Sequence, residues 1–324
     1  MAAVAVLVPA YNHAAYVAEA VRSVDGDVEI VAVDDCSTDG TYDVLRSLVA
    51  EVPALRVYRN ERNAGGVATV LRALAETTAP YVTVLASDDR WLPGRVDRQL
   101  ALLEAGAQWS FGRAWVIDAA GARVGTEPQG PPPDADGMLR TLLRGQGVYA
   151  PTLMYRRDLL ERIGGLSQAL WEDLVVTLRF AALGEPAFVP EPLVEYRVHG
   201  ANVHLDQLAR GLHVTAHVEA VASLLAWPDL PAAARPVAEA HAEAWAVLAR
   251  LQRGEPPRPR SAPRAALDGV VRRQARDLVR EIGSAELRRF EVALRLAGCH
   301  GGARAIADVR GGPIWRRALR RLVR

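Results

Sequence analysis

The first 200 residues alternate short apolar runs with amphipathic stretches. Runs rich in Val, Ile and Leu are followed by segments whose apolar residues recur at helical spacing, which is typical of strands connected by helices. This alternation with short connections predicts an α/β fold, a doubly wound and mostly parallel sheet flanked by helices. The predicted strands are residues 4–8, 28–33, 55–58, 81–85, 109–117, 188–189 and 193–197. The predicted helices are residues 16–24, 42–49, 67–76, 93–104, 138–144, 157–163 and 173–183.

The pattern changes after residue 202. Residues 205–251 are rich in Ala and Leu at helical spacing and carry almost no strand signal, and residues 254–263 (GEPPRPRSAP) have the composition of a linker. We therefore predict two domains, an α/β domain over residues 1–202 and an all-helical C-terminal region over residues 203–324.

Charge is distributed unevenly along the chain. The formal net charge is only +1, yet residues 253–324 contain 18 Arg against seven acidic residues. Near the end, Trp and Leu alternate with Arg in residues 314–323, a pattern that suits an interfacial helix on anionic lipid. Docking on the acidic α/β domain, a homodimer contact and a solvated helix packed on its own domain are the alternatives. The tail lacks the aromatic interleaving of nucleic-acid binders, so no nucleic-acid partner is expected.

Cysteine usage and hydropathy bear on the compartment. The chain has two cysteines, too few for a disulfide framework or a zinc cluster, and this favours a reducing compartment. Residues 1–10 lack the basic region of a signal peptide, and no apolar run approaches the roughly 18 residues of a membrane span. We predict a cytoplasmic protein that the Arg-rich tail could bring to the inner face of the membrane.

Polar clusters follow three of the predicted parallel strands. Tyr11 comes after the first strand, Asp34 and Asp35 after the second, and Asp88 and Asp89 after the strand at residues 81–85. Because the carboxyl ends of parallel strands form one edge of an open sheet, these side chains are expected to share a crevice. Two adjacent carboxylates are stabilised by a divalent cation that carries a diphosphate, although an acidic turn in solvent gives the same local pattern.

Three other nucleotide- and metal-binding motifs are excluded. Residues 35–40 (DCSTDG) begin like a calcium loop, but the twelfth position is Arg46 where that loop requires Glu. Neither a G-x-G-x-x-G turn nor a P-loop occurs in the sequence, so a Rossmann oxidoreductase or a P-loop kinase is unsupported.

Six motifs occur in order along the first 202 residues. They are VLVPAYN (residues 6–12), VAVDDCSTDGT (31–41), NAGG (63–66), LASDD (85–89), WED (171–173) and EYRVHGAN (195–202). Together they resemble the motifs of the family 2 glycosyltransferases, which have the GT-A fold, and the resemblance covers roughly residues 4–202.

The resemblance implies a role for each matching residue. The implied nucleotide-binding residues are Pro9, Tyr11, Asp35 and Asp88. The implied metal-binding residues are Asp89 and His199, with Mn²⁺ or Mg²⁺ as cofactor. Asp173 matches the catalytic base, and Trp171 and Glu172 are the candidates for contact with the acceptor or donor sugar.

Two departures from the family pattern stand out. The Ala-Arg-Asn triplet that often follows the Asn-x-Gly element is replaced by Thr69, Val70 and Leu71, so the phosphate contact from this helix is in doubt. The first carboxylate of the acidic motif is replaced by Ala86.

The predicted function is metal-dependent, inverting transfer of a sugar from a nucleoside-diphosphate sugar to an acceptor hydroxyl. A UDP-sugar is the favoured donor, with dTDP- and GDP-sugars left open. A surface glycan or a small secondary metabolite would be the acceptor. The alternatives are a non-catalytic sugar-nucleotide-binding or scaffolding protein recruited through its Arg-rich tail, and a sugar nucleotidyltransferase.

Overall fold

The computed structural model describes residues 2–311 except 126, 127, 129, 131, 134, 167, 168, 170, 201–211, 257, 282 and 283. The chain divides into two compact units. Unit 1 comprises residues 1–133, 148–168 and 183–202, and unit 2 comprises residues 134–147, 169–182 and 203–324. Two stretches of the first 202 residues, 134–147 and 169–182, thus belong to the helical unit.

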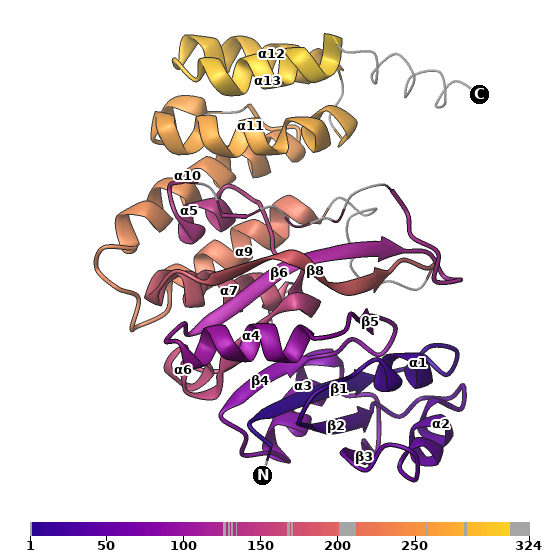
Figure 1. Cartoon of the computed structure of the whole chain (residues 1–324). Helices are drawn as coiled ribbons and strands as arrows, with labels where there is room; N and C mark the ends of the chain where they lie inside the picture. Colours follow the sequence, from indigo (N-terminus) through magenta and orange to yellow (C-terminus); the bar gives the residue numbers. More distant parts are fainter. Residues whose placement is uncertain are drawn as a thin grey trace, which may run out of the picture. The chain divides into compact units, whose positions relative to one another are not determined.

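Unit 1 is built on a mixed eight-stranded sheet in the order β3-β2-β1-β4-β7-β6-β8-β5. Its first half is the predicted parallel sheet, in which β1 lies between β2 and β4 (Figure 1). The first four strands are β1 (Val4–Ala10), β2 (Val28–Asp34), β3 (Leu55–Arg59) and β4 (Tyr81–Val84). Every residue of β1 except Pro9 is buried, as its unbroken apolar sequence predicts for a central strand covered on both faces.

Helices connect these parallel strands and cover the sheet. The connecting helices are α1 (Val17–Arg22), α2 (Thr41–Leu48) and α3 (Gly66–Ala75), and α4 (Arg95–Glu104) follows β4 further along the chain. The start of α2 is fixed by Asp39, whose carboxylate accepts hydrogen bonds from the backbone N–H and the hydroxyl of Thr41. Such a side-chain acceptor satisfies a donor that would otherwise be unpaired in the first turn of the helix.

The second half of the sheet contains antiparallel pairs. β7 (Met154–Arg156) runs antiparallel to both β4 and β6 (Trp109–Ile117), and β5 (Arg90–Trp91) runs antiparallel to β8. The sequence pattern predicted neither β5 nor β7, because two or three residues are too few to show a period. A 3₁₀ turn, η1 (Ala150–Thr152), leads into β7, and α6 (Arg157–Arg162) follows it.

β8 (Ala187–Arg197) is one strand where two short strands were predicted. Pro190 and Pro192 interrupt its apolar pattern, and a proline cannot donate to a neighbouring strand. The register with β6 shifts on both sides of Arg113, and this irregularity accommodates the prolines. At Gly112 a Cβ atom would lie 2.6 Å from Leu193 Cδ1, so only glycine fits where the two strands approach.

Unit 2 is helical. Its longest helices are α10 (Arg235–Gln252) and α11 (Arg264–Glu281), which pack on one another, and α11 also packs on α13 (His300–Gly311). The other elements are α5 (Met138–Leu143), α7 (Glu172–Leu183), α9 (His213–Leu225), η2 (Pro259–Ser261) and α12 (Ser284–Leu296). The fold is therefore α/β with a helical C-terminal region, as predicted. The interfacial helix predicted at residues 314–323 lies outside the described residues.

Candidate active site

The loops after β1 and β2 are joined by hydrogen bonds that fix their backbones. Asn12, with a positive φ of 53°, donates its backbone N–H to Ser37 Oγ at 2.9 Å, and its side-chain oxygen accepts the N–H of Thr38 at 2.9 Å. Asn tolerates this left-handed conformation better than most residues. Tyr11 precedes this turn and is 44% exposed, so its ring is available at the edge of the sheet for stacking.

Asp35 is the centre of the neighbouring loop. Its carboxylate accepts hydrogen bonds from Asn60 Nδ2 at 2.7 Å and from the backbone N–H groups of Ala64 and Gly65 at 2.8 and 2.9 Å. The motif NAGG therefore wraps around Asp35, and both carboxylate oxygens have a fixed direction. A carboxylate has about four acceptor sites, so one more donor can still be bound.

Asp34 stabilises the loop after β2. It is completely buried, it accepts the backbone N–H of Ser37 at 3.1 Å, and Arg59 Nε lies 3.2 Å from the same oxygen. Arg72, whose phosphate contact the sequence left in doubt, donates to the backbone oxygen of Arg59 and to Asn60 Oδ1, both at 2.6 Å. Its guanidinium therefore holds the loop after β3.

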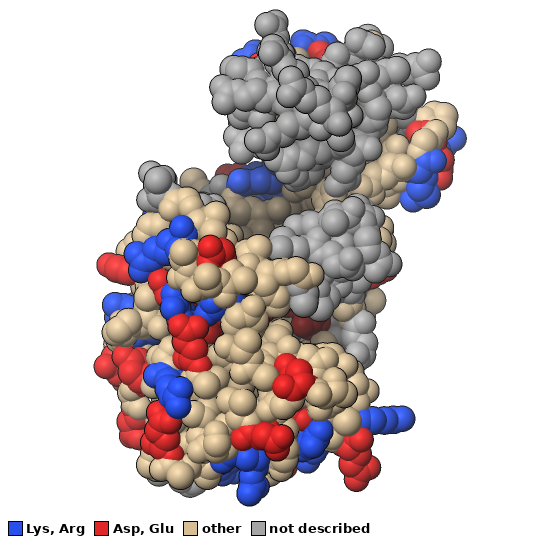
Figure 2. All heavy atoms as spheres, turned by 90° about the vertical axis from the view of Figure 1, so that its right-hand side faces the viewer, with Lys and Arg blue, Asp and Glu red and all other residues tan. Residues whose placement is uncertain are grey.

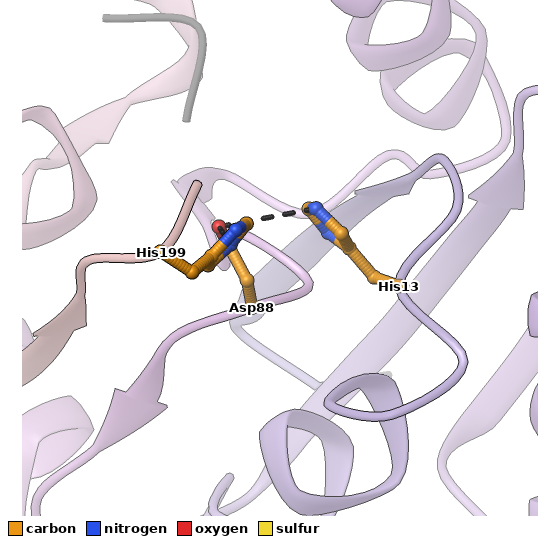
Figure 3. Close-up of side chains that lie close together, drawn as sticks. All are labelled: His13, Asp88 and His199. Atoms are coloured by element: carbon orange, nitrogen blue, oxygen red, sulfur yellow. Dashed lines mark hydrogen bonds and ion pairs between the residues drawn. The ribbon is translucent and has the colours of Figure 1, made fainter. Parts of the chain in front are cut away.

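The end of β4 brings Asp88 against two histidines from distant parts of the chain (Figure 3). Asp88 Oδ2 lies 3.0 Å from His199 Nε2 and 3.9 Å from His13 Nε2. One ligand atom from each of the three side chains lies within 4.8 Å of the others. Nδ1 of His13 lies 2.8 Å from Ser87 Oγ, which leaves its Nε2 to face Asp88. Burial lowers the pKa of His13, so its imidazole is neutral at pH 7 and can act as a ligand.

Arg197, two residues before His199, ties the end of β8 to this loop. Its Nε donates to the backbone oxygen of Asp88 at 2.7 Å, and its Nη2 donates to Glu19 at 2.6 Å. The guanidinium also lies 4.8 Å from the centre of the Tyr16 ring, and that ring stacks on His199 at 5.1 Å. Arg197 is only 2% exposed, so its side chain is fixed by these contacts and holds His199 in one position.

Asp89 is placed differently from Asp88. It is 1% exposed, and its Oδ1 accepts the backbone N–H of Arg197 at 2.8 Å. Its other oxygen is buried without a hydrogen-bond partner. Burial, together with the neighbouring charge of Asp88, raises the pKa of Asp89 well above its usual range. The prediction that Asp89 binds the metal stays a prediction, while Asp88 is the carboxylate that faces the histidines.

Beneath Asp89 lies a buried arginine. Arg95 is completely buried, donates to Gln99 Oε1 at 3.0 Å and to Thr83 Oγ1 at 2.9 Å, and stacks 3.9 Å from the centre of the Trp91 ring. Burial lowers the pKa of Arg95 to about 9, while the charge of Asp89 raises it. A positive charge in the core thus offsets part of the cost of burying the Asp89 carboxylate.

The remaining predicted site residues belong to unit 2. Glu172 and Asp173 form the first turn of α7, where the helix dipole favours negative charge. Asp173 is exposed and Glu172 is half-buried. Burial, with a contribution from Asp173, raises the pKa of Glu172 to about 7. The ring of Trp171 packs edge-on against His217, with 5.3 Å between the ring centroids.

The structure therefore brings together the predicted residues of unit 1. Asp35 hydrogen-bonds the loop after β3, and the loops of Tyr11 and Asp35 are joined through Asn12. Asp88 and His199 are in direct contact. His13 was missed, although it stands at the end of a predicted strand directly after the Tyr11–Asn12 pair. Arg197 was missed as well, because nothing in the sequence indicates that an arginine at the end of a strand is buried.

The mixed sheet with its flanking helices has the GT-A fold. The structure superimposes on Staphylococcus aureus TarS 1-349 in complex with UDP-GlcNAc with a TM-score of 0.60 and 16% identity, covering 95% of this chain and 92% of that chain. It also matches the mannosyltransferase PcManGT from Pyrobaculum calidifontis in complex with GDP-Man and Mn²⁺, with a TM-score of 0.55 and 19% identity over 95% and 87% of the two chains.

Sequence comparison gives the family. Residues 5–164 match glycosyl transferase family 2, and the chain is a family 2 glycosyltransferase. An uncharacterized glycosyltransferase of Nostoc sp. is 29% identical over 217 residues, which are 63% of this chain and 67% of that protein. The putative teichuronic acid biosynthesis glycosyltransferase TuaG of Bacillus subtilis is 34% identical over 113 residues. That match spans 33% of this chain and less than half, 45%, of TuaG.

The surface and the hydropathy of the described residues add two observations. Acidic and basic side chains are interspersed on the described part of the face shown in Figure 2. Among the described residues, none of the helices combines the length and the apolar character required to cross a bilayer.

Proposed function

We propose that the protein transfers a sugar from a nucleoside-diphosphate sugar, most favourably UDP-linked, to an acceptor hydroxyl with inversion at the anomeric carbon. The observation that carries the proposal is the cluster of His13, Asp88 and His199 at the carboxyl edge of the sheet, next to the Tyr11 and Asp35 loops. Family membership and the donors named for TarS and PcManGT support the donor class.

The residues present fit a divalent metal ion. Two imidazole nitrogens and a carboxylate oxygen within 4.8 Å of one another form a mixed N/O donor set that a first-row divalent ion accepts. We propose His13, Asp88 and His199 as the ligands of Mn²⁺ or Mg²⁺, with the buried Asp89 holding the backbone of Arg197. When bound, the ion would neutralise charge on the diphosphate leaving group.

The nucleotide would be held by unit 1. In this proposal the exposed ring of Tyr11 stacks on the base, the free acceptor site of Asp35 binds a ring N–H, and Pro9 shapes the pocket. The hydrogen bonds from the NAGG loop keep the Asp35 carboxylate pointing in one direction, which lowers the cost of ordering it when the donor binds.

Asp173 would be the catalytic base. The acceptor oxygen forms a bond to the anomeric carbon as the bond from that carbon to the phosphate oxygen breaks. The hydroxyl proton passes to the Asp173 carboxylate, and the nucleoside diphosphate leaves. One base and a single displacement give inversion. An exposed carboxylate at the start of a helix is suited to accept this proton. Trp171 and Glu172 are proposed to border the sugars.

The acceptor is proposed to be a hydroxyl of a surface glycan, because TuaG is named for teichuronic acid biosynthesis. A small secondary metabolite is the other acceptor class considered. We further propose a cytoplasmic location in which the Arg-rich C-terminal region contacts the membrane or a second copy of the chain.

The proposal is tested by measuring nucleoside diphosphate release from UDP-, dTDP- and GDP-sugars with Mn²⁺ or Mg²⁺. Wild type should release the diphosphate from one donor class, and Asp173→Asn should lower the rate by about 10²–10⁴-fold without weakening donor binding. Asp158→Asn is the matched control, because Asp158 is an exposed carboxylate in the first turn of another helix, α6. Wild type that binds a sugar nucleotide but never turns it over would contradict the proposal.

A further inference from the structure

Three aromatic rings connect the start of α7 with the C-terminal helices of unit 2. Trp171 lies edge-on to His217 of α9 at 5.3 Å, and His217 stacks nearly parallel on Trp245 of α10, with 4.2 Å between centroids and 16° between planes. Offset or edge-on contacts of this kind contribute about 0.5–1.5 kcal/mol beyond the area that they bury. The residue next to Trp171 is Glu172, and Asp173 follows.

The middle ring of this stack is held in one orientation. His217 Nδ1 lies 2.8 Å from the backbone oxygen of His213, and since a carbonyl only accepts, this nitrogen carries the proton. His217 is 5% exposed, and burial lowers its pKa to about 4, so the ring is neutral at pH 7. A neutral, oriented ring gives Trp171 and Trp245 a fixed surface.

The third ring reaches a further segment. Trp245 is completely buried, and its indole N–H donates to the backbone oxygen of Leu143 at 2.8 Å, at the end of α5. Gly145 adopts a φ of 88°, and a Cβ atom there would lie 3.0 Å from the Trp245 ring. Helices α9 and α10 therefore contact both parts of unit 2 that come before residue 203 in the chain, residues 134–147 and 169–182.

Asp173 lies two residues after Trp171, in the first turn of α7. Its Oδ1 accepts the N–H of Leu174 at 2.9 Å, and Thr177 Oγ1 donates to its backbone oxygen at 2.8 Å. The ring of Trp171 packs on His217 immediately before this turn, so a change in the stack is expected to move the backbone from which the Asp173 side chain extends.

We propose that the Trp171–His217–Trp245 stack orients the side chain of the proposed base Asp173 at the start of α7. Helices α9 and α10, which carry His217 and Trp245, thereby contribute to catalysis. His217 and Trp245 are thus positioning residues. The inference rests on the proposed function of Asp173 and assigns a role to the region after residue 203. It also gives the Trp171 ring a packing contact with His217.

Positioning has a large effect on rate, because a displacement of about 1 Å at a reacting group costs roughly 10²-fold. His217→Ala removes the middle ring, and kcat is expected to fall by about 10²-fold while the KM for the donor and the donor-induced thermal shift stay unchanged. His217→Phe keeps the aromatic face but loses the hydrogen bond to His213. It should therefore melt lower than wild type and retain most of kcat.

Phe290→Leu is the matched control for stability. Phe290 is completely buried in α12 of the same unit, so this variant loses buried volume without touching the stack. It should lower Tm and leave kcat at the wild-type value. If His217→Ala does not fold, Trp171→Leu, at a half-buried position, takes its place and should show the same loss of kcat.

The outcomes separate the two proposals. Wild type without turnover contradicts the proposed function. An active wild type whose His217→Ala or Trp171→Leu variant keeps kcat contradicts the positioning role alone. Equal loss in His217→Phe and His217→Ala also contradicts it, since the aromatic face would then not be the cause. A raised acceptor KM with unchanged kcat in Trp171→Leu would assign Trp171 to the sugar instead.

Discussion

His199 Nε2 lies 3.0 Å from Asp88 Oδ2, although 111 residues separate them in sequence. Asp88 follows β4 and His199 follows β8, two strands that are not neighbours in the sheet. The pair forms because Arg197 donates its side-chain Nε–H to the backbone oxygen of Asp88 and its backbone N–H to the Asp89 carboxylate, which holds the end of β8 against this loop. The proposed metal site therefore depends on the correct pairing of β8 as much as on its own ligands.

Substitution of Asp88 should remove metal binding. Asp88→Asn deletes the only charge of the proposed ligand set, and we expect the Mn²⁺-induced rise in Tm of the donor-free protein to disappear. His13→Ala and His199→Ala should each weaken Mn²⁺ affinity by about tenfold or more, a loss at least as large as that from an outer-shell partner. Calorimetric titration with Mn²⁺ measures these affinities.

The control for this series is Asp97→Asn, since Asp97 is an exposed carboxylate in the first turn of α4. Its Mn²⁺ affinity should equal that of wild type. Unchanged affinity in His13→Ala would remove His13 from the ligand set and leave Asp88 and His199.

Replacement of Arg197 by lysine should destabilise unit 1 and weaken the metal site. Lysine keeps the charge but cannot reach Asp88 and Glu19 at once, and each lost charge-assisted hydrogen bond costs about 1.5–3 kcal/mol. We expect Tm to fall by several degrees and Mn²⁺ affinity to fall with it. Arg22→Lys is the control, because the Arg22–Glu51 ion pair is exposed on both sides and should contribute nothing measurable.

Substitution of Asp35 separates donor binding from metal binding. Asp35→Asn leaves one of the NAGG backbone donors facing an amide N–H₂, so we expect a loss of about 1–3 kcal/mol in stability together with weaker UDP binding. Asp118→Asn is matched, because Asp118 Oδ1 likewise accepts two backbone N–H groups, from Ala120 and Ala122. That variant should lose stability and bind UDP as wild type does. Equal UDP affinity in both variants would count against a nucleotide role for Asp35.

Acid should destabilise unit 2 through His217. Its pKa is about 4 in the folded protein against 6.5 for the free side chain, so the unfolded chain binds more protons between these values. The contribution of neutral His217 to the free energy of unfolding is fully present above about pH 6.5. It falls by roughly 3 kcal/mol as the pH drops towards 4. Tm measured from pH 7 to pH 4.5 should therefore fall more in wild type than in His217→Phe. Parallel curves would contradict the neutral, buried state of His217.

Glu172 should have the opposite effect. Its pKa is about 7 in the folded protein against 4.5, so the folded state binds more protons between these values, and stability falls as the pH rises through this range. Glu172→Gln removes a penalty of up to about 3 kcal/mol above pH 7. The variant should melt above wild type at pH 8, with the two curves converging near pH 4.5. If the Tm curves of wild type and Glu172→Gln coincide at every pH, the Glu172 carboxylate is solvated and the prediction is wrong.

The parallel half of the sheet could be predicted from the sequence because β1, β2 and β4 are mostly apolar runs followed by polar loops. The prediction is less complete where the signal is short or interrupted. β5 and β7 contain two and three residues, and β8 crosses two prolines that the irregular pairing around Gly112 absorbs. Local pattern does not encode such pairing, which depends on the fit of distant strands.

The same distinction applies to the site. Asp35 and Asp88 were identified because acidic residues directly follow strands, a local feature. His13 follows a strand too, but a single histidine there carries no distinctive pattern. The burial of Arg197, and the choice between Asp88 and Asp89 as the carboxylate facing the histidines, depend on where β8 ends in space, and only the folded chain shows this.

The interleaved course of the chain through the two units has a consequence for biosynthesis. α5 and α7 leave the ribosome early. Trp245, which is made about a hundred residues after α5, donates a hydrogen bond to the end of α5 and stacks on His217, the ring that contacts Trp171 before α7. At translation rates of about 5–20 residues per second, these two segments wait for several seconds with their apolar faces uncovered. We expect the nascent chain to need chaperone protection during this interval, and truncation before α10 to produce an aggregating polypeptide rather than a smaller enzyme.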